Sequence, residues 1–445
     1  MRKIAAAISL IFICLSCMKG KKVDVIFHNA SINLLDENQT VHQAMAVKNG
    51  KIIETGPERQ ILNKYSSNET VDLQQHKVYP SFICSYVPLE QLMIQMESTD
   101  LKTAQSENAI LTLIEKHFSI FPKPTSFISL NFPLKFLNGN LKIVQLLNEK
   151  YKDKIIVFYS KEINKVFYKL KKGSFKEVEV SENEVYNWIT RIIQLNSGKK
   201  QQIIDQILTS YLENGYTTLD IPINHYEDLK IIEKTSKEKK LTTHFYLTEE
   251  LFRENINVKS NKYNGLIIDT LIDLSQQISY AKKHQLQIVF PSNIKDENIK
   301  LIQQHLSDYT KDHRWKIIIN KTPSANELSF YTNNNFSLIF HSNLEYKLQN
   351  DFTYFSIRNN SSNPTSFFKL IDDQKIIDFD IVNTALYSQT KWASYQNFEE
   401  LNLGTLEKNK WATFIVLNSK LRDNNNSSVF PLQIYSKGKN IYKAY

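Results

Sequence analysis

The stretch DVIFHNASINLLDENQTVHQAMAVKNGKIIETGPERQIL, from Asp24 to Leu62, decides the fold prediction when it is taken together with GTLEKNKWATFIVLN, from Gly404 to Asn418. The first stretch continues through Val71-Asp72-Leu73 into an apolar strand that begins at Pro80. The second is followed by a closing strand near Ile434 to Tyr442. Neither stretch is persuasive alone, but together they bracket most of the chain.

Both stretches resemble the amidohydrolase superfamily. The first is similar to the β-domain that opens those chains, and the second to the segment by which they return to it. The segment between them resembles the branch called amidohydrolase family three, although it is shorter than that branch usually is. The resemblance implies an α/β protein with a (β/α)8 TIM-like barrel and a small composite β-sandwich domain formed by both chain ends. The expected boundaries are a signal peptide over 1–16, a tether over 17–22, the composite domain over 23–79 and 401–445, and the barrel over 80–400.

The residues between the two stretches alternate between short β-rich runs and helical windows, as parallel βα units require. Apolar residues from Ile203 to Leu212 recur at helical spacing, and Gly215 follows as a stop before the strand Tyr216 to Ile221. The other expected strands are Phe82–Val87, Phe127–Leu130, Ile155–Tyr159, Thr243–Leu247, Leu266–Ile268, Gln287–Phe290, Lys316–Ile319, Leu338–Phe340 and Phe352–Ile357. These ten strands exceed an eight-stranded barrel by two, so two are misread or belong to an insertion.

Composition indicates a globular protein, because 445 residues with 42% hydrophobic and 11% aromatic content can bury a large core. The net charge is +9, but the basic residues are scattered among acidic ones and form no stripe interleaved with aromatic residues. We therefore expect no nucleic-acid partner, whereas attraction to anionic lipid headgroups is consistent with this charge. The sequence has no Gly-rich phosphate loop and no Gly-x-Ser-x-Gly elbow.

The N-terminus has the pattern of an export signal, with Arg2 and Lys3 ahead of an apolar stretch from Ile4 to Leu15. The sequence Leu15-Ser16-Cys17 resembles a bacterial lipoprotein cleavage site, which implies that Cys17 is lipidated and becomes the mature N-terminus. A lipid anchor would tether the protein to a membrane without spanning it. We expect an exported, membrane-anchored protein that faces the periplasm; an ordinary cleaved signal or an uncleaved anchor is the alternative.

The ten residues PSFICSYVPL, from Pro80 to Leu89, stand where the resemblance places a His-x-His metal clamp, and they offer Tyr86 and Pro88 instead. The family uses one or two divalent metals, typically zinc, which require converging imidazoles and carboxylates. The other aligned positions have also changed: Gly265 replaces a lysine, Pro291 a histidine, Ile318 and Ile319 an acidic residue and a histidine, and Asn359 an aspartate. We expect no metal cofactor.

Asp220 and Asp269 each close a predicted strand, which makes them candidates for an acid and base pair at the carboxyl ends of the strands. For Asp220 the alternative is that it caps a loop or pairs with a neighbouring cation. Tyr86, Arg358 and Asn359 are candidates for binding a polar ligand in a metal-free mouth, although a tyrosine is also an ordinary plug for a vacated cavity.

Cys84 is the single thiol left once Cys14 is cleaved off and Cys17 is lipidated, so no disulfide framework is expected. Core packing is favoured for Cys84, because the sequence locates no base beside it that would lower the pKa of the thiol. A displaced metal site built from His225 and His341 with carboxylates stays open as an alternative.

Family membership implies metal-dependent hydrolysis of C–N bonds such as non-peptide amides, but function follows sites and not folds. The leading hypothesis is a pseudo-enzyme with a binding or scaffold role, whose partner is an unidentified small molecule or protein. One alternative is an active hydrolase that uses a displaced or metal-free site. The other is a purely structural envelope protein.

Overall fold

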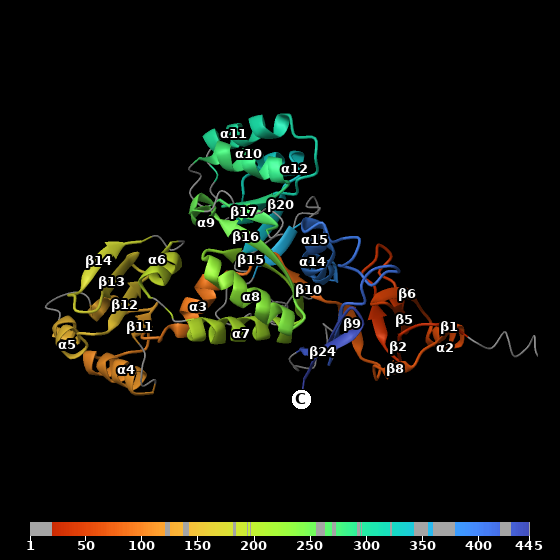
Figure 1. The fold of residues 1–445 in the computed structure, drawn as a ribbon, viewed down its shortest axis with the longest axis horizontal. Coiled ribbons are helices and arrows are strands. Elements are labelled where there is room, and N and C mark those ends of the chain that lie inside the picture. The colour runs from red at the N-terminus through yellow and green to blue at the C-terminus, as the bar shows by residue number, and fades with distance from the viewer. Residues whose placement is uncertain are drawn as a thin grey trace, which may run out of the picture. The chain divides into compact units, whose positions relative to one another are not determined.

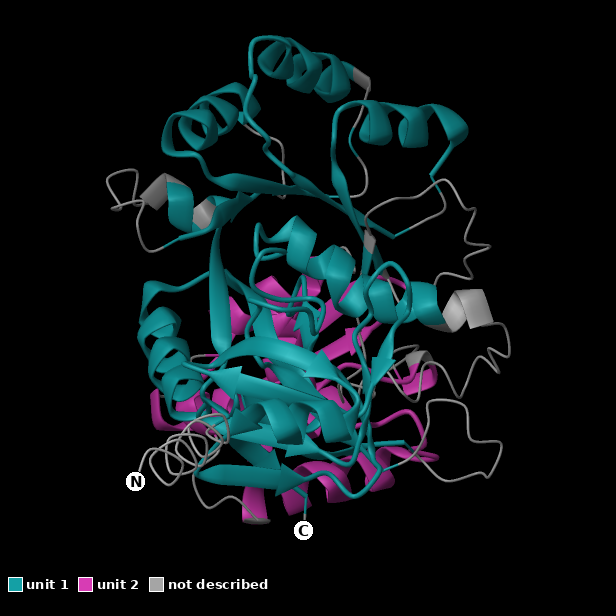
Figure 2. Ribbon diagram, turned by 90° about the vertical axis from the view of Figure 1, so that its right-hand side faces the viewer, with its two compact units in different colours: residues 1–87, 208–445 teal, residues 88–207 magenta. Residues whose placement is uncertain are grey.

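The computed structural model describes residues 20–120, 125–136, 142–180, 184–193, 195, 197–254, 263–268, 273–291, 294, 296–320, 323–341, 355–358, 379–418 and 429–444. The chain divides into two compact units, which Figure 2 colours separately: residues 1–87 with 208–445, and residues 88–207. No helix in the described ranges is long and apolar enough to cross a bilayer.

The first unit contains a curled sheet in which every neighbouring pair of strands is parallel (Figures 1 and 2). Its order is β10 (Phe82–Cys84), β15 (Tyr216–Ile223), β16 (Thr242–Thr248), β17 (Gly265–Ile267), β18 (Gln287–Phe290), β19 (Lys316–Ile319), β20 (Ser337–His341) and β21 (Phe355–Arg358). Parallel neighbours need crossover connections. The described helices along this part are α7 (Ser197–Glu213), α8 (Tyr226–Glu238), α9 (Glu249–Glu254), α10 (Leu274–His284), α11 (Asp296–Ser307), α12 (Ala325–Asn333), α14 (Phe379–Gln389) and α15 (Lys391–Gln396).

The strand order resolves the surplus in the sequence-based count. Eight of the ten expected strands form the curled sheet, whereas Phe127–Leu130 and Ile155–Tyr159 correspond to β11 (Ser126–Ser129) and β12 (Ile155–Ser160) of a different sheet. The two extra strands therefore belong to an insertion between β10 and β15. The mixed α/β class is confirmed, and closure of the curled sheet into a complete barrel stays a prediction.

Gly215 shows why the junction between α7 and β15 needs a glycine. Its φ is +90°, which lies in the left-handed region, and β15 begins at the next residue. A Cβ atom there would lie 3.3 Å from side-chain atoms of Ile415 and Phe82. The predicted helix stop is confirmed, and the close approach lets the C-terminal strands pack beside β10.

The first unit has two further sheets, one built from the N-terminal part alone and one that combines both chain ends. One has the order β6 (Lys51–Gly56), β5 (Ala44–Lys48), β2 (Val25–His28), β8 (Glu69–Asp72); the other has the order β24 (Lys439–Lys443), β23 (Pro431–Ser436), β22 (Phe414–Leu417), β9 (Lys77–Pro80), β3 (Ser31–Asn33), β4 (Val41–His42). Antiparallel pairing of β22 with β9 joins the C-terminal part to the N-terminal part. One hydrophobic cluster takes Phe27 and Val47 from the first sheet and Phe414 and Tyr435 from the second.

Two residues of the segment 17–22, which is predicted to be a tether, lie in a strand, and residues 17–19 are outside the described residues. Lys21 and Lys22 form β1, which pairs in parallel with β7 (Tyr65–Ser66) after helix α2 (Glu58–Lys64). The backbone N–H of Val23 also donates to the carbonyl of Ser66. These hydrogen bonds hold the chain from Lys21 onward against the β-domain.

The second unit is an α/β insertion with its own cores. Its sheet has the order β11-β12-β13-β14, where β13 is Lys165–Lys169 and β14 is Lys176–Glu179. Successive residues of β11 point to opposite faces, so Phe127 joins one hydrophobic cluster and Ile128 another. The helices of this unit are α3 (Leu89–Glu97), α4 (Glu107–Ile120), α5 (Lys142–Lys150), α6 (Val185–Ile192), a 3₁₀ turn (Leu134–Phe136) and the first part of α7.

Candidate functional site

Asp220 lies in the interior of β15 and does not close that strand, because β15 continues to Ile223. The prediction that Asp220 sits at a strand end is therefore wrong. In register Asp220 pairs with His244, which is only the third residue of β16. Asp220 is 1% exposed. In register it lies near the amino-terminal end of β16, whereas the preceding Leu219 pairs with Cys84, the last residue of β10.

The carboxylate of Asp220 has both of its oxygens engaged. Its Oδ2 accepts a hydrogen bond from Nζ of Lys316 at 2.6 Å, and Lys316 is the fully buried first residue of β19. Its Oδ1 lies 2.9 Å from Nδ1 of His244 and accepts from Nδ2 of Asn397 at 2.8 Å. The alternative reading of Asp220, as the partner of a neighbouring cation, is thus what the structure shows.

The network continues from Lys316 to three more polar side chains. Its Nζ donates to the Tyr246 hydroxyl at 2.9 Å and to Oδ1 of Asn397 at 2.6 Å. The Tyr246 hydroxyl donates to Oε1 of Gln287 at 2.8 Å, and Nε2 of Gln287 donates to the carbonyl of Gln396 at 2.7 Å. Because Gln396 ends α15 and Asn397 follows it, the network fastens the helix that leads back to the β-domain onto the sheet.

Electrostatics favour the charged forms of Asp220 and His244, whereas burial lowers the pKa of Lys316 against the opposing effect of Asp220. Burial acts to raise the pKa of Asp220, but Lys316 and His244 beside it hold that pKa below its ordinary value. Burial acts to lower the pKa of His244, and hydrogen bonds to Asp220 and Glu399 overcome it and raise the pKa to about 9. An ionised Asp220 that is fully hydrogen-bonded and enclosed has the properties of a structural ion pair. An acid–base role for Asp220 stays a prediction without support from these contacts.

The carboxyl ends of the strands have a different character. Tyr86 follows β10 and packs against a cluster formed by Tyr246, Ile267, Val289 and Ile318, which come from β16, β17, β18 and β19. Apolar groups and an aromatic ring therefore occupy the part of the sheet where the resemblance placed metal ligands. This packing agrees with the alternative that Tyr86 plugs a vacated cavity.

The position of Gly265 in the structure differs from the one that the resemblance implies, where relatives have a lysine. It begins β17, so it lies at the opposite end of that strand from the position of a metal ligand. A Cβ atom on Gly265 would lie 2.5 Å from the carbonyl oxygen of Gln287 and 2.6 Å from Cδ1 of Tyr246. The glycine leaves room for the Tyr246 ring, whose hydroxyl belongs to the Asp220 network.

The donor chemistry of the described residues does not fit a divalent metal. Within the described ranges, no group of three or more His, Cys, Asp or Glu side chains is placed to hold an ion. Ile319 ends β19 and is buried, and Pro291 directly follows β18. His225 precedes α8, and His341 ends β20 with its side chain outside the described set.

Several predicted residues cannot be placed relative to this region. Asp269, Asn359 and Cys17 lie outside the described residues, and Arg358 is described only as the last residue of β21, without its side chain. Cys84 ends β10, is buried, and donates from Sγ to the carbonyl of Tyr86 at 3.3 Å. That contact is what core packing of the thiol predicts.

Sequence reasoning missed Lys316 as a member of the site. The available signal was the segment RWKIIINK, in which Lys316 directly precedes an apolar run. A lysine at the start of a strand with three isoleucines must either reach solvent or find a buried anion. The sequence does not reveal which anion, because Asp220 lies 96 positions earlier.

No protein-family model and no curated protein sequence matches this chain. Solved structures do match. An uncharacterized metal-dependent hydrolase from Pyrococcus furiosus superposes with a TM-score of 0.68 at 14% identity, covering 89% of this chain and 99% of the other. An adenosine deaminase from Xanthomonas campestris with bound zinc gives 0.60 at 10% identity, with 95% and 93% covered. Helicobacter pylori aminofutalosine deaminase in complex with methylthio-coformycin gives 0.56 at 15% identity, with 94% and 100% covered.

Proposed function

We propose that this chain, which has the fold of the amidohydrolase superfamily, has lost metal-dependent hydrolysis and acts as a binding or scaffold protein. One observation carries the proposal: Tyr86 packs into the cluster of Tyr246, Ile267, Val289 and Ile318. Isoleucine and valine provide no lone pairs for a metal, and filling the space with them excludes the water that hydrolysis consumes.

The chemistry of the family explains what has been lost. A bound divalent metal would supply a hydroxide nucleophile near neutral pH and would polarise the carbonyl of an amide. At positions 86, 318 and 319 this chain has a phenol and two aliphatic side chains. The aliphatic groups have no lone pair for zinc, and a neutral phenol is a weaker donor than an imidazole or a carboxylate. We therefore derive no catalytic step through a metal for this protein.

A binding role is supported by polar groups that lack partners. The hydroxyl oxygens of Ser85, next to β10, and of Ser356, in β21, are buried and have no hydrogen-bond partner among the described residues. These two strands contact each other. Because a buried hydroxyl without a partner costs free energy, a small polar ligand or an ordered water would stabilise this part of the sheet.

We also propose that β10 and β21 close the curled sheet into a TIM-like barrel between residues 80 and 400, with residues 88–207 inserted in the sequence between β10 and the rest of the sheet. The contact between β10 and β21, and the packing of α14 and α15 against both strands, support this closure. The hydrophobic cluster shared by the two sheets of the β-domain supports a composite β-sandwich formed by both chain ends.

The same proposal places the protein outside the cytoplasm, anchored through lipid on Cys17 and facing the periplasm. The support is in the sequence: Arg2 and Lys3, the apolar stretch Ile4 to Leu15, and a cysteine directly after Ser16. The described chain becomes attached to the β-domain at Lys21, so only a few residues would separate the anchor from the folded protein.

Metal content tests the loss of hydrolysis. The mature chain, residues 17–445 with Cys17→Ser, would be purified without chelators or a polyhistidine tag and measured by elemental mass spectrometry before and after exposure to zinc. We expect substoichiometric metal in a folded, monodisperse sample, while a zinc-dependent amidohydrolase carried through the same steps keeps its metal. Stoichiometric zinc, together with amide hydrolysis that a chelator abolishes and zinc restores, would overturn the proposal.

Turnover measured on metal-free protein would favour the alternative of a displaced site. In that case Asp269→Asn should abolish turnover without changing the circular dichroism spectrum, whereas the pseudo-enzyme proposal expects no turnover to lose. Asp220→Asn does not serve as the matched control, because its ion pair with Lys316 makes the loss of folding an expected result.

A further inference from the structure

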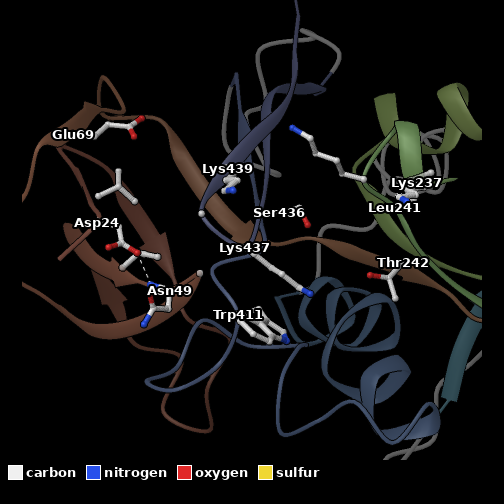
Figure 3. A pocket seen from close by; sticks show the side chains of 15 residues that line it. Asp24, Asn49, Glu69, Lys237, Leu241, Thr242, Trp411, Ser436, Lys437 and Lys439 are labelled. Atoms are coloured by element: carbon white, nitrogen blue, oxygen red, sulfur yellow. Dashed lines mark hydrogen bonds between the residues drawn. The ribbon is translucent and has the colours of Figure 1, made fainter. Parts of the chain in front are cut away.

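A cavity of about 780 Å³ lies within the first unit, away from the carboxyl ends of the strands. Its walls are the β-domain near β2 and β5, the hairpin of β23 and β24, and the segment that joins α8 to β16, as Figure 3 shows. Cavities that hold small molecules typically measure about 300–1,000 Å³. The volume is therefore suitable for a small ligand of several functional groups.

Positive charge dominates the lining of this cavity. The lining includes four lysines, Lys237, Lys240, Lys437 and Lys439, and two carboxylates, those of Asp24 and Glu69. Figure 3 shows both carboxylates on the β-domain, across the cavity from Lys237. None of the four ammonium groups forms a salt bridge with a described residue. Asp24 is already engaged, because its Oδ2 accepts from the backbone N–H of Asn49 at 2.5 Å. The charge that remains available in the cavity is thus mainly cationic.

The backbone presents two of these lysines by tight turns. Lys240 and Lys437 have φ values of +57° and +51°, and Gly438 follows with +74°. A Cβ atom on Gly438 would lie 3.0 Å from Cγ1 of Val47, so the hairpin turn rests directly on β5. The end of α8 is capped by backbone groups, since the N–H groups of Lys239 and Leu241 donate to the carbonyls of Thr235 and Ser236. These capping bonds do not use the side chains of Lys237 and Lys240.

Trp411 adds an aromatic wall next to Lys437. The Nζ atom of Lys437 lies 4.6 Å from the centre of the Trp411 ring, and Nζ of Lys51 lies 4.8 Å from it. A cation over an aromatic face is attracted by the ring, but an anion attracts it more strongly. An anion in the cavity would therefore draw Lys437 toward itself and change the surroundings of the indole.

We propose that this cavity binds a small polyanion, a molecule with two or more phosphate, sulfate or carboxylate groups. Four lysines without a salt bridge to a described residue repel each other around one space, and an anion with several negative groups relieves that repulsion at several points at once. The site is independent of the proposed loss of hydrolysis, because it shares no residue with the Tyr86 cluster or with the Asp220 network.

Isothermal titration of the mature chain with inorganic pyrophosphate tests this site. The cavity variant carries Lys237→Gln, Lys240→Gln, Lys437→Gln and Lys439→Gln. The control carries Lys102→Gln, Lys171→Gln, Lys172→Gln and Lys176→Gln, which removes the same charge from exposed positions of the 88–207 unit. We expect saturable binding that weakens with salt, a loss of affinity of about tenfold or more in the cavity variant, and little change in the control.

Fluorescence gives a second, local readout. Pyrophosphate should change the tryptophan emission of the wild-type chain, and Trp411→Phe should remove that change. Equal weakening in the cavity and control variants would show general attraction to a basic protein and would overturn the proposal. Absence of saturable pyrophosphate binding would overturn it as well. Thermal unfolding of both variants shows whether the fold is kept.

Discussion

Asp220 and Lys316 form a buried ion pair that joins β15 to β19, with Oδ2 and Nζ 2.6 Å apart and neither side chain more than 1% exposed. A charge without its partner is costly in such a place, so each residue makes the other tolerable. Asn397, which directly follows α15, hydrogen-bonds both members of the pair: its Nδ2 donates to Asp220 and its Oδ1 accepts from Lys316. This relationship makes the amino-terminal side of the curled sheet a polar support, whereas the carboxyl ends are filled by apolar groups.

Removing both members of this pair should destabilise the protein by less than the sum of the two single losses. We expect Lys316→Met or Asp220→Asn alone to lower the free energy of unfolding by about 3–5 kcal/mol, because each leaves an uncompensated buried group. The double variant should lose less than the sum of the two. Urea unfolding followed by circular dichroism measures the three values, and simple additivity would show that the ion pair does not couple the residues.

His244 should make stability depend on pH in the alkaline range. Its pKa is raised from 6.5 to about 9 in the folded chain, so the stabilisation is fully present below pH 6.5 and is lost as the pH rises through about 9. At about 1.36 kcal/mol per unit, the loss is on the order of 3 kcal/mol. Unfolding of the wild type between pH 6 and 10 measures it. A His244→Gln variant should lack this step, and an identical pH profile for both would contradict the assignment.

Gly265 should tolerate no side chain. A Cβ atom there would approach the carbonyl of Gln287 and the Tyr246 ring to about 2.5–2.6 Å, so Gly265→Ala must displace a strand or the ring. We expect a loss of roughly 1–3 kcal/mol, typical of overpacking. Gly173→Ala is the control, because its nearest neighbour is the Leu170 carbonyl at 3.4 Å. Equal melting temperatures for the two variants would mean that the space above Gly265 is larger than the structure shows.

Lipidation at Cys17 predicts that substitutions of Cys17 and Cys14 have different effects on membrane attachment. Cys17→Ser should abolish incorporation of a labelled fatty acid and release the chain from the membrane fraction. Cys14→Ser should keep both properties, because Cys14 lies in the part of the signal that is removed. Fractionation and fatty-acid labelling in a bacterial host measure the outcome. Retention of label by Cys17→Ser would contradict lipidation at this position.

Local patterns were enough to predict most of the curled sheet. Strands such as Lys316–Ile319 and Gln287–Phe290 have the predicted bounds, because buried parallel strands are apolar runs that end at polar or turn-forming residues. Gly215 could be recognised as a helix stop for a similarly local reason. The prediction that Tyr86 and Pro291 stand where relatives carry metal ligands also comes from the sequence, through the resemblance alone.

Positions along a strand were less predictable than the strands themselves. Asp220 was expected at the end of its strand and lies three residues before it, and Gly265 was expected at the metal end and begins β17. An error of this size changes the neighbours of a side chain completely, because a strand advances about 3.3 Å per residue. The sequence contains no local signal for which residue of each strand lies at the carboxyl end of the sheet.

The sequence by itself therefore determined the α/β class and the two chain ends that pair as β9 and β22, and it predicted that the expected metal ligands are missing. Only the tertiary structure decided that Asp220 has Lys316 as its partner and that Tyr86 packs over apolar side chains. It also decided that four lysines line one cavity, from α8, from the segment after it and from the β23–β24 hairpin. The physical reason is distance along the chain. Strand and helix patterns arise from neighbouring residues, whereas burial and electrostatic pairing depend on groups that folding brings together from remote segments.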